Sequence, residues 1–384
     1  MDDQTKPRFS PQTLVAQAFG AYEPVTRALV PPVHMSATYL RDPDNGYRAG
    51  YVYGRTDNVS VQQAENLIAA LEGADEALLF TSGMAAATTV LLALEKPTHI
   101  VASQVMYWGF RSWLRDIGRY GHRVTFVETS DLDAVRAAVK PGETGLLWIE
   151  TPSNPLWTVT DIAAVSEIAH KADATLCVDS TIATPVFTKP LTLGADIVMH
   201  SATKYLNGHS DVIAGALATS HEGALWERIR KMRGQHGNAL APFDAWLLLR
   251  GMRTLDVRVR AQAKSAAWLA GKLVGHPAVA EVLYPGLEGR RGYDVALRQM
   301  SGGFGGMFSI RVRKGEKAAI AVAAKVELWK RATSLGGVES LIEHRASIEG
   351  AGSPCPGDLL RFSVGLENAE ELHLDLTRAL AAAA

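Results

Sequence analysis

The sequence predicts an α/β fold with a mostly parallel sheet covered by helices on both faces, followed by a smaller α+β region. Between residue 61 and about residue 220, short apolar runs of strand length alternate with segments of helical spacing. This alternation is typical of parallel sheets, because each parallel strand pair needs a crossover connection. Hydrophobic residues make up 47% and charged residues 21% of the 384 residues, as expected for a soluble globular chain of about two domains.

The chain is predicted to have three parts: an N-terminal arm at 1–60, an α/β domain at 61–252 and an α+β domain at 253–384. Apolar runs predict strands, in chain order, at 77–80, 100–103, 124–127, 146–149, 175–178, 196–199, 214–218, 279–284, 307–312 and 359–364. Helical spacing predicts helices at 61–71, 83–94, 242–250, 255–274, 316–325 and 369–383.

The arm at 1–60 is rich in Pro, Gly and aromatic residues and has little predicted regular structure. It contains five tyrosines from Tyr22 to Tyr53, so we expect it to dock on another surface rather than to be a disordered tail. It ends at Asn58-Val59-Ser60, where Ser60 is available as the N-cap of the next helix.

Bulk properties exclude several classes of function. The net charge of −1 gives no electrostatic case for binding nucleic acid or a membrane surface. No metal-ligand cluster is apparent, and the two cysteines cannot form a disulfide framework; Cys177 lies in an apolar run and reads as a buried small hydrophobe. The first residues lack a signal-peptide pattern and no run is long enough to span a membrane, so we expect a cytoplasmic protein.

Two further features of the second half have ordinary structural interpretations. The arginines Arg253, Arg258 and Arg260 are expected to form a solvated or interface face. The glycine-rich run at 302–306 precedes a predicted strand instead of opening a helix, so it is interpreted as a flexible loop and not as a dinucleotide fingerprint.

An acid and a lysine follow two of the predicted buried strands. Asp179 ends the strand at 175–178, and Lys204 follows the strand at 196–199 with Ser201 and Thr203 beside it. Ligands of open α/β sheets bind beyond the carboxyl ends of strands, so both side chains are expected to reach one crevice. A lysine that forms a Schiff base, an acid that keeps a pyridine nitrogen protonated and two hydroxyls for a phosphate together suit pyridoxal phosphate (PLP).

The segments Val-Asp-Ser-Thr-Ile-Ala-Thr-Pro (178–185) and His-Ser-Ala-Thr-Lys-Tyr-Leu-Asn-Gly-His-Ser-Asp (200–211) closely resemble the cofactor segments of the Cys/Met-metabolism PLP enzymes. That family includes the cystathionine γ-synthases, the cystathionine β- and γ-lyases, methionine γ-lyase and the O-acyl-homoserine sulfhydrylases. The resemblance extends from about residue 30 to about residue 366. It implies the fold-type-I (aspartate aminotransferase-like) architecture, PLP as the cofactor, an amino-acid substrate and a homotetramer.

The resemblance also implies roles for particular residues. Lys204 is the Schiff-base lysine and base, Asp179 holds the ring nitrogen, and Tyr107 stacks on the ring and assists proton transfer. Tyr53 and Arg55 clamp the phosphate of a neighbouring subunit's cofactor, which suits the planar fork of an arginine. The remaining cofactor-binding residues are Ser82, Gly83, Met84, Asn154, Thr181, Ser201 and Thr203.

Arg361 is predicted to bind the α-carboxylate of the substrate. Without a ligand, an arginine between apolar strand residues would be an unpaired charge facing a core. The planar guanidinium group of an arginine suits a carboxylate. The loop Ser-Leu-Gly-Gly-Val-Glu-Ser (334–340) matches the family's substrate loop, and it supplies Ser334 and Glu339 as further substrate-binding residues.

Within the family, the Ser-Leu-Gly-Gly loop and the chain length favour γ-replacement of the cystathionine γ-synthase type. Cystathionine β-lyase and γ-lyase activities remain alternatives. A PLP-fold protein that binds without catalysing is a more remote alternative, because Lys204, Asp179 and Arg361 are all present. An aminotransferase on the same fold is disfavoured by the Ser-Ala-Thr-Lys context (201–204) and by the arm that contains Tyr53 and Arg55. The sequence departs from the family at Trp108 and Phe110, which indicates a bulkier or reshaped pocket wall. It also has Glu343-His344-Arg345 where proline is common.

Overall fold

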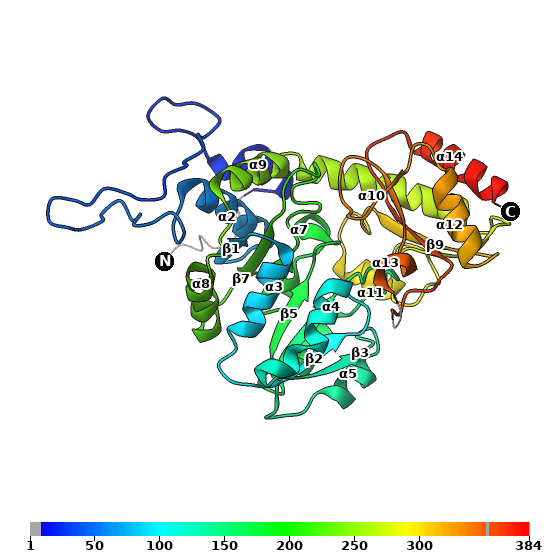
Figure 1. Cartoon of the computed structure of the whole chain (residues 1–384), viewed down its shortest axis with the longest axis horizontal. Helices are drawn as coiled ribbons and strands as arrows, with labels where there is room; N and C mark the ends of the chain where they lie inside the picture. Colours follow the sequence, from blue (N-terminus) through cyan, green and yellow to red (C-terminus); the bar gives the residue numbers. More distant parts are fainter. Residues whose placement is uncertain (1–8, 351–352, 384) are drawn as a thin grey trace. The chain divides into compact units, whose positions relative to one another are not determined.

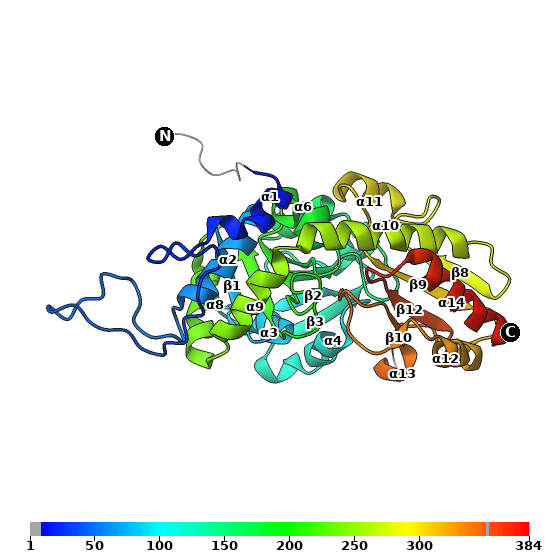
Figure 2. The same ribbon diagram turned by 90° about the horizontal axis from the view of Figure 1, so that it is seen from above.

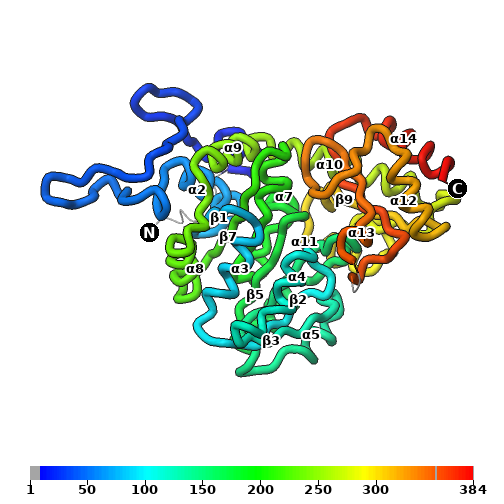
Figure 3. The backbone as a smooth tube through the Cα atoms, viewed as in Figure 1, coloured from blue at the N-terminus to red at the C-terminus, as the bar shows by residue number. Residues whose placement is uncertain are grey.

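The computed structural model describes residues 9–350 and 353–383 (Figures 1 and 3). The chain divides into two compact units. Unit 1 comprises Met1–Pro97 and Asp196–Asp256, and unit 2 comprises Thr98–Ala195 and Val257–Ala384. The predicted fold class is confirmed: the fold is mixed α/β, with a mostly parallel central sheet and a smaller second sheet. Within the described residues, every helix is too short or too polar to cross a membrane.

Unit 1 contains three strands in the order β1-β7-β6, and both strand pairs are antiparallel. The strands are β1 (Glu76–Phe80), β6 (Ile197–His200) and β7 (Gly215–Thr219). Its helices are α1 (Pro11–Ala16), α2 (Val59–Glu72), α3 (Gly83–Leu92), α8 (Ala224–His236) and α9 (Pro242–Met252). Nearly every residue of these strands is buried. Since alternate side chains point to opposite faces, both faces of the strands are covered.

The start of α2 differs from the sequence-based expectation. Asn58, and not Ser60, is the N-cap: its Oδ1 accepts the backbone N–H groups of Ser60 (2.9 Å) and Val61 (3.4 Å). Ser60 lies inside the first turn, and its hydroxyl donates to the carbonyl of Pro32 and accepts the N–H of His34. The Ser60 hydroxyl therefore attaches the arm to α2, and Asn58 caps the helix.

The arm contains one short helix, α1, and otherwise no helix longer than a single 3₁₀ turn in its described part. Figures 1 and 2 show the chain between α1 and α2 as extended loops that project away from the strands of unit 1. Apolar side chains on these loops are exposed, including Val25, Leu29, Met35 and Leu40. Leu40 retains 97% of its accessible surface.

The first part of unit 2 contains a parallel group of strands in the order β5-β4-β2-β3. The strands are β2 (His99–Ser103), β3 (Arg123–Val127), β4 (Thr144–Glu150) and β5 (Thr175–Asp179), with α4 (Trp108–Arg115), α5 (Leu132–Ala138), α6 (Ile162–His170) and α7 (Thr184–Phe187). Cys177 is fully buried, as predicted. The register pairs Glu150 with Asp179, so two acids end neighbouring strands at the same edge.

The second part of unit 2 contains a five-stranded sheet in the order β10-β11-β12-β9-β8. The strands are β8 (Val279–Leu283), β9 (Met307–Val312), β10 (Lys330–Arg331), β11 (Leu341–His344) and β12 (Leu359–Ser363). The helices are α10 (Leu255–Leu273), which begins at the end of unit 1, and α11 (Tyr293–Gln299), α12 (Glu316–Lys325), α13 (Ala346–Glu349) and α14 (Ala369–Ala382). The aromatic rings of Phe308, Trp329 and Phe362 pack together in the core of this sheet.

The expected solvated or interface face of Arg253, Arg258 and Arg260 is wrong for Arg258. Arg258 retains only 3% of its accessible surface, whereas Arg253 is exposed. Burial lowers the pKa of the Arg258 guanidinium to about 10, because the charged form is poorly solvated there. Charge alone did not distinguish the two arginines, since exposure depends on which face of the helix packs on its neighbours.

Candidate active site

The predicted site residues fall into two groups, one in each unit. Unit 1 contains the predicted phosphate ligands and the predicted Schiff-base lysine: Tyr53, Arg55, Ser82, Gly83, Met84, Ser201, Thr203 and Lys204. Unit 2 contains the predicted ring and substrate ligands: Tyr107, Asn154, Asp179, Thr181, Ser334, Glu339 and Arg361. Several of these residues, among them Ser82, Asp179 and Lys204, lie at strand ends or in the turns that follow them.

In unit 1, the N-terminus of α3 forms a close-packed cradle. Ser82 is the N-cap, and its Oγ accepts the N–H of Ala85 at 3.0 Å. The first N–H groups of a helix have no intrahelical acceptor, and together with the helix dipole they favour an anion. A Cβ on Gly83 would lie 3.1 Å from Cβ and Oγ of Ser201, so glycine is needed for the turn after β6 to approach the helix this closely.

We predict that Gly83→Ala weakens PLP binding and lowers the free energy of unfolding by about 1–3 kcal/mol. The added methyl group must displace Ser201, a predicted phosphate ligand. Fluorescence titration of the apoprotein with PLP and thermal unfolding measure the two effects. Gly118→Ala is the control, because a Cβ there meets no atom within 4 Å. Equal PLP affinity in both variants would contradict the cradle.

The turn after β6 is fixed at two points within unit 1. The hydroxyl of Thr203 donates to the carbonyl of Ala214 (3.2 Å) and accepts its N–H (2.9 Å), so it binds the turn to the start of β7. His200, the last residue of β6, places its Nε2 2.5 Å from Oε1 of Glu72, and both side chains are fully buried. Sequence reasoning missed Glu72 and His200, which anchor the base of the turn that contains Lys204.

Tyr53 and Arg55 lie at the end of the arm. The Arg55 guanidinium is 5.5 Å from the centre of the Tyr53 ring, and its Nη1 donates to the carbonyl of Gly234 near the end of α8. Both side chains are exposed. The conformation of the pair is therefore set by α8 of the same chain, and its role toward a neighbouring subunit stays a prediction.

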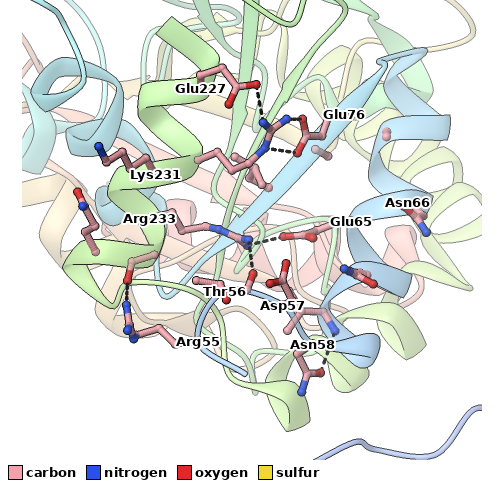
Figure 4. A pocket seen from close by; sticks show the side chains of 18 of the residues that line it. Arg55, Thr56, Asp57, Asn58, Glu65, Asn66, Glu76, Glu227, Lys231 and Arg233 are labelled. Carbon is pink, nitrogen blue, oxygen red and sulfur yellow. Dashed lines mark hydrogen bonds and ion pairs between the residues drawn. The ribbon is translucent and has the colours of Figure 1, made fainter. Parts of the chain in front are cut away.

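Arg55 also lines a cavity of about 650 Å³ between α2, β1 and α8 (Figure 4). Two arginines of this cavity have carboxylate partners. Arg233 contacts Glu65 at 2.6 Å, and Arg230 pairs with Glu76 and Glu227. These carboxylates neutralise the two guanidinium groups, so the cavity does not have the excess positive charge that a phosphate site needs.

In unit 2, the loops that contain Tyr107 and Asn154 meet at one carboxylate. Glu150 ends β4 and is buried, and its Oε2 accepts the backbone N–H of Tyr107 at 2.7 Å. Its Oε1 accepts the backbone N–H of Asn154 at 2.8 Å. In the next strand, Oδ1 of Asp179 accepts both the N–H (3.0 Å) and the hydroxyl (2.5 Å) of Thr181. Thr181 thus orients Asp179, and Glu150 is a residue that sequence reasoning missed.

The ionisation of Glu150 is disfavoured in the folded chain. Burial, and after it the negative charge of Asp179, raise the pKa of the Glu150 carboxyl from its ordinary value of 4.5 to about 8. The two backbone N–H groups and the guanidinium of Arg345 oppose this shift. The two acids at the ends of β4 and β5 therefore resist being charged together.

We predict that Glu150→Gln flattens the dependence of folding stability on pH. The folded chain keeps the Glu150 proton up to about pH 8, whereas the unfolded chain loses it near 4.5. The folded state therefore binds more protons in this window, so the stability contributed by Glu150 is full below the ordinary pKa and is lost as pH rises through the folded value. The difference in Tm between wild type and Glu150→Gln should shift in favour of the variant as pH rises. A difference that is constant from pH 5 to pH 9 would contradict the raised pKa.

Arg361 lies in a buried network of charges. Its Nη2 lies 2.5 Å from Oε2 of Glu343 and donates to the carbonyl of Ser334 at 2.6 Å. The same Glu343 oxygen lies 3.1 Å from Nη1 of Arg345, which also pairs with Glu349 at 2.8 Å. The sequence singled out Arg361 as a charge that needs a partner, and Glu343 on β11 is one such partner.

The substrate loop at 334–340 is held in place from two sides within unit 2. The N–H of Gly336 donates to Oγ of Ser363 at 2.8 Å, and Nε2 of Gln262 on α10 donates to the carbonyl of Gly337 at 2.6 Å. Ser334 adopts a left-handed backbone conformation with a φ of 83°. This conformation, which is unfavourable for a residue with a Cβ, directs its carbonyl to Arg361. Glu339 is half-buried in the same loop.

The residues present fit PLP. The cradle at Gly83 has the donors and the close approach that a phosphate needs. In unit 2, Oδ1 of Asn154 is buried and accepts no hydrogen bond from the described residues, so its amide has capacity for a further polar partner. Thr181 fixes the direction of the Asp179 carboxylate, an acceptor that suits a protonated nitrogen.

Comparisons with known proteins agree with this chemistry. The sequence model of the Cys/Met metabolism PLP-dependent enzymes matches residues 12–381. The chain is 42% identical to cystathionine gamma-synthase of Mycobacterium tuberculosis over 96% of each chain. It is 40% identical to cystathionine gamma-lyase of Bacillus subtilis over 92% of this chain and 95% of that one. The solved structure of cystathionine gamma synthase from Xanthomonas oryzae, in complex with aminoacrylate and cysteine, superposes with a TM-score of 0.93, at 35% identity over 98% of each chain. The chain belongs to the family of Cys/Met metabolism PLP-dependent enzymes.

Proposed function

We propose that this PLP-dependent enzyme catalyses γ-replacement, in which L-cysteine and an O-acyl-L-homoserine form cystathionine. The observation that carries the proposal is the 42% identity, over 96% of both chains, to a relative named cystathionine gamma-synthase. The reaction breaks the Cγ–O bond of the acyl-homoserine and forms a Cγ–S bond. The acyl group leaves as a carboxylic acid, which takes up the proton of the cysteine thiol.

We propose that the predicted cofactor-binding residues hold PLP. The phosphate is held by Ser82, Gly83, Met84, Ser201 and Thr203. Tyr53 and Arg55 of a neighbouring subunit complete this phosphate site. Tyr107 stacks on the ring, Asn154 binds its phenolic oxygen, and Thr181 orients Asp179 toward the ring nitrogen. When bound, PLP supplies an electron sink for the carbanion at Cα.

The substrate amino acid is held and deprotonated by side chains of this chain. The Lys204 amine is the base of the reaction. In its unprotonated form it takes the Cα proton, and it then moves protons at Cβ. The Arg361 fork holds the α-carboxylate, and Ser334 and Glu339 line the same position. Within unit 2, Arg361 is already oriented by Glu343 and by the Ser334 carbonyl.

Carbon–sulfur cleavage is the alternative activity. It is favoured by the 40% identity to a relative named cystathionine gamma-lyase, which differs little from the identity to the synthase. Trp108, whose ring centre lies 6.1 Å from that of Tyr107, is a bulky side chain beside Tyr107 in unit 2, whereas Phe110 is buried against Trp148. A bulkier wall limits the room for a second amino acid, which only the synthase needs.

We further propose that the enzyme is a cytoplasmic homotetramer. The exposed apolar side chains of the arm, such as Leu29 and Leu40, support a subunit contact, because a large exposed apolar surface is otherwise unfavourable in water. The position of Tyr53 and Arg55 at the end of this arm is consistent with a role in the neighbour's site.

Product analysis of the purified enzyme with added PLP tests the proposal. One reaction contains L-cystathionine alone, and two others contain L-cysteine with either O-succinyl- or O-acetyl-L-homoserine. Cystathionine formed from an acyl-homoserine, with little keto acid from the first reaction, is the expected result. 2-Oxobutyrate with cysteine from the first reaction would instead make the enzyme a γ-lyase, and pyruvate with homocysteine a β-lyase.

A further inference from the structure

Glu150 brings two separate segments of unit 2 to a single carboxylate. Tyr107 lies 43 residues upstream, at the N-cap of α4, and Asn154 lies four residues downstream, in the turn that follows β4. Both contacts are made to backbone N–H groups, at 2.7 and 2.8 Å, one to each carboxylate oxygen. Each oxygen of the buried Glu150 carboxyl group accepts one of these N–H groups, so this pair of bonds fixes both turns relative to β4.

We propose that Glu150 is a positioning residue, whose carboxyl group sets the placement of Tyr107 and Asn154 on PLP beside Asp179. This inference rests on the proposed function, because it assumes that Tyr107 and Asn154 contact the cofactor. Glu150 itself needs no contact with substrate or PLP. It acts through the main chain of Tyr107 and Asn154, which make the contacts with PLP.

The position of Glu150 suits this role. Its carboxyl is the cross-strand neighbour of Asp179, because the parallel register pairs the two residues and neighbouring strands lie about 4.8 Å apart. Adjacent strands therefore end in Asp179, which is predicted to hold the ring nitrogen, and in Glu150, which holds the turns of Tyr107 and Asn154. A shift of Glu150 would move Tyr107 and Asn154 relative to Asp179.

The backbone at Glu150 is itself held by neighbouring strands and loops. Its N–H donates to Oγ of Ser103 at the end of β2 (3.2 Å), and Ser103 contacts the hydroxyl of Thr129 at 3.0 Å. Thr129 in turn contacts Thr160 at 2.8 Å. All of these side chains are buried, so the carboxylate projects from a rigid base and transmits that rigidity to both turns.

A purely structural role is the competing interpretation, and unit 2 offers a matched control for it. Asp375 on α14 is also a buried carboxylate that accepts backbone N–H groups, from Glu327 (3.0 Å) and Leu328 (2.8 Å). These partners are not among the predicted cofactor or substrate residues. Asp375→Asn therefore also removes a buried carboxylate that accepts two backbone N–H groups, but it leaves the residues assigned to PLP unchanged.

The test compares wild type, Glu150→Gln, Glu150→Asp and Asp375→Asn as full-length proteins. The amide of Glu150→Gln presents a donor to one of the two N–H groups, and the shorter side chain of Glu150→Asp falls short of both. We expect both Glu150 variants to raise the Kd for PLP by about 10- to 100-fold. We also expect them to weaken the visible circular dichroism of bound PLP relative to its absorbance, because that signal depends on how the ring is oriented. Asp375→Asn should lower Tm and leave both cofactor properties at wild-type values.

The inference is overturned if both Glu150 variants bind PLP as wild type does and keep its circular dichroism, whatever happens to their Tm. Equal cofactor defects in Asp375→Asn and the Glu150 variants would also overturn it, because the effect would then follow from lost stability. Failure of the proposed function is recognised separately. In that case wild type itself binds PLP but forms no cystathionine from either acyl-homoserine.

Discussion

Lys204→Ala is expected to abolish turnover, with kcat reduced by about 10³-fold or more. In the proposed reaction the same amine anchors PLP and moves the protons at Cα and Cβ, so its loss removes two functions at once. The surrounding turn should keep its fold, because Thr203 and Ala214, and separately His200 and Glu72, hold it without the lysine side chain.

Steady-state kinetics with the substrate pair that wild type accepts measure this effect, and the visible absorbance of bound PLP reports the loss of the anchor. Lys171→Ala is the control, because Lys171 is an exposed residue of unit 2 that pairs only weakly with Glu167 at 3.7 Å. It should retain wild-type kcat. If Lys204→Ala kept more than a tenth of the wild-type kcat, another base would have to be sought.

Glu343→Ala is expected to cause the largest loss of stability, about 3–5 kcal/mol, because it removes a buried carboxylate from two guanidinium groups. Arg345 and Arg361 both contact the same Glu343 oxygen, and all three side chains are almost completely buried. Buried charges that lose a partner cannot regain their hydration. Arg361 should also become less well oriented, so we expect KM for the amino-acid substrate to rise more than kcat falls.

Urea unfolding and steady-state kinetics measure the two parts of this prediction. Glu167→Ala removes one partner of an exposed ion pair and should change stability by less than about 1 kcal/mol. Glu343→Gln keeps the volume and one acceptor oxygen, so its loss should lie between those of the other two variants. A Glu343→Ala protein as stable as Glu167→Ala would show that the network contributes no net stability.

The elements that can be predicted from sequence are those whose signal is local. The parallel strands β2, β4 and β5 are buried on both faces, so each appears as a short continuous apolar run and its end can be read directly. The ends of these runs placed Asp179 correctly at the end of β5 and Lys204 in the turn after β6. Polar side chains that follow buried strands can therefore be located from the amino-acid pattern alone.

Glu150 was missed because its function depends on contacts that are remote in sequence. An acid followed by Thr-Pro resembles an ordinary turn residue, and nothing near it indicates that its carboxylate accepts the N–H of Tyr107. The pairing of Glu150 with Asp179 is a matter of strand register, which the two strand segments do not specify by themselves.

The network at Arg361 was missed for the same reason in a different sheet. β11 has four residues and ends in Glu343-His344, so it lacks the apolar run that marks a strand. Only the antiparallel register of β11 and β12 brings Glu343 opposite Arg361. The sequence identified the arginine that needs a partner and not the partner. Arg258 is the converse case, since a charged residue that was expected to be solvated is buried.

The assignment of Lys204 as the residue that carries PLP is tested most directly by chemical reduction and peptide mapping. Treatment of the wild-type enzyme with added PLP by borohydride reduces the C=N bond between lysine and cofactor to a stable C–N bond. Mass spectrometry of the proteolysed protein then locates the added mass. We expect the pyridoxyl group on Lys204 alone. Stable attachment to a different lysine, or none in a protein that turns over substrate, would contradict it.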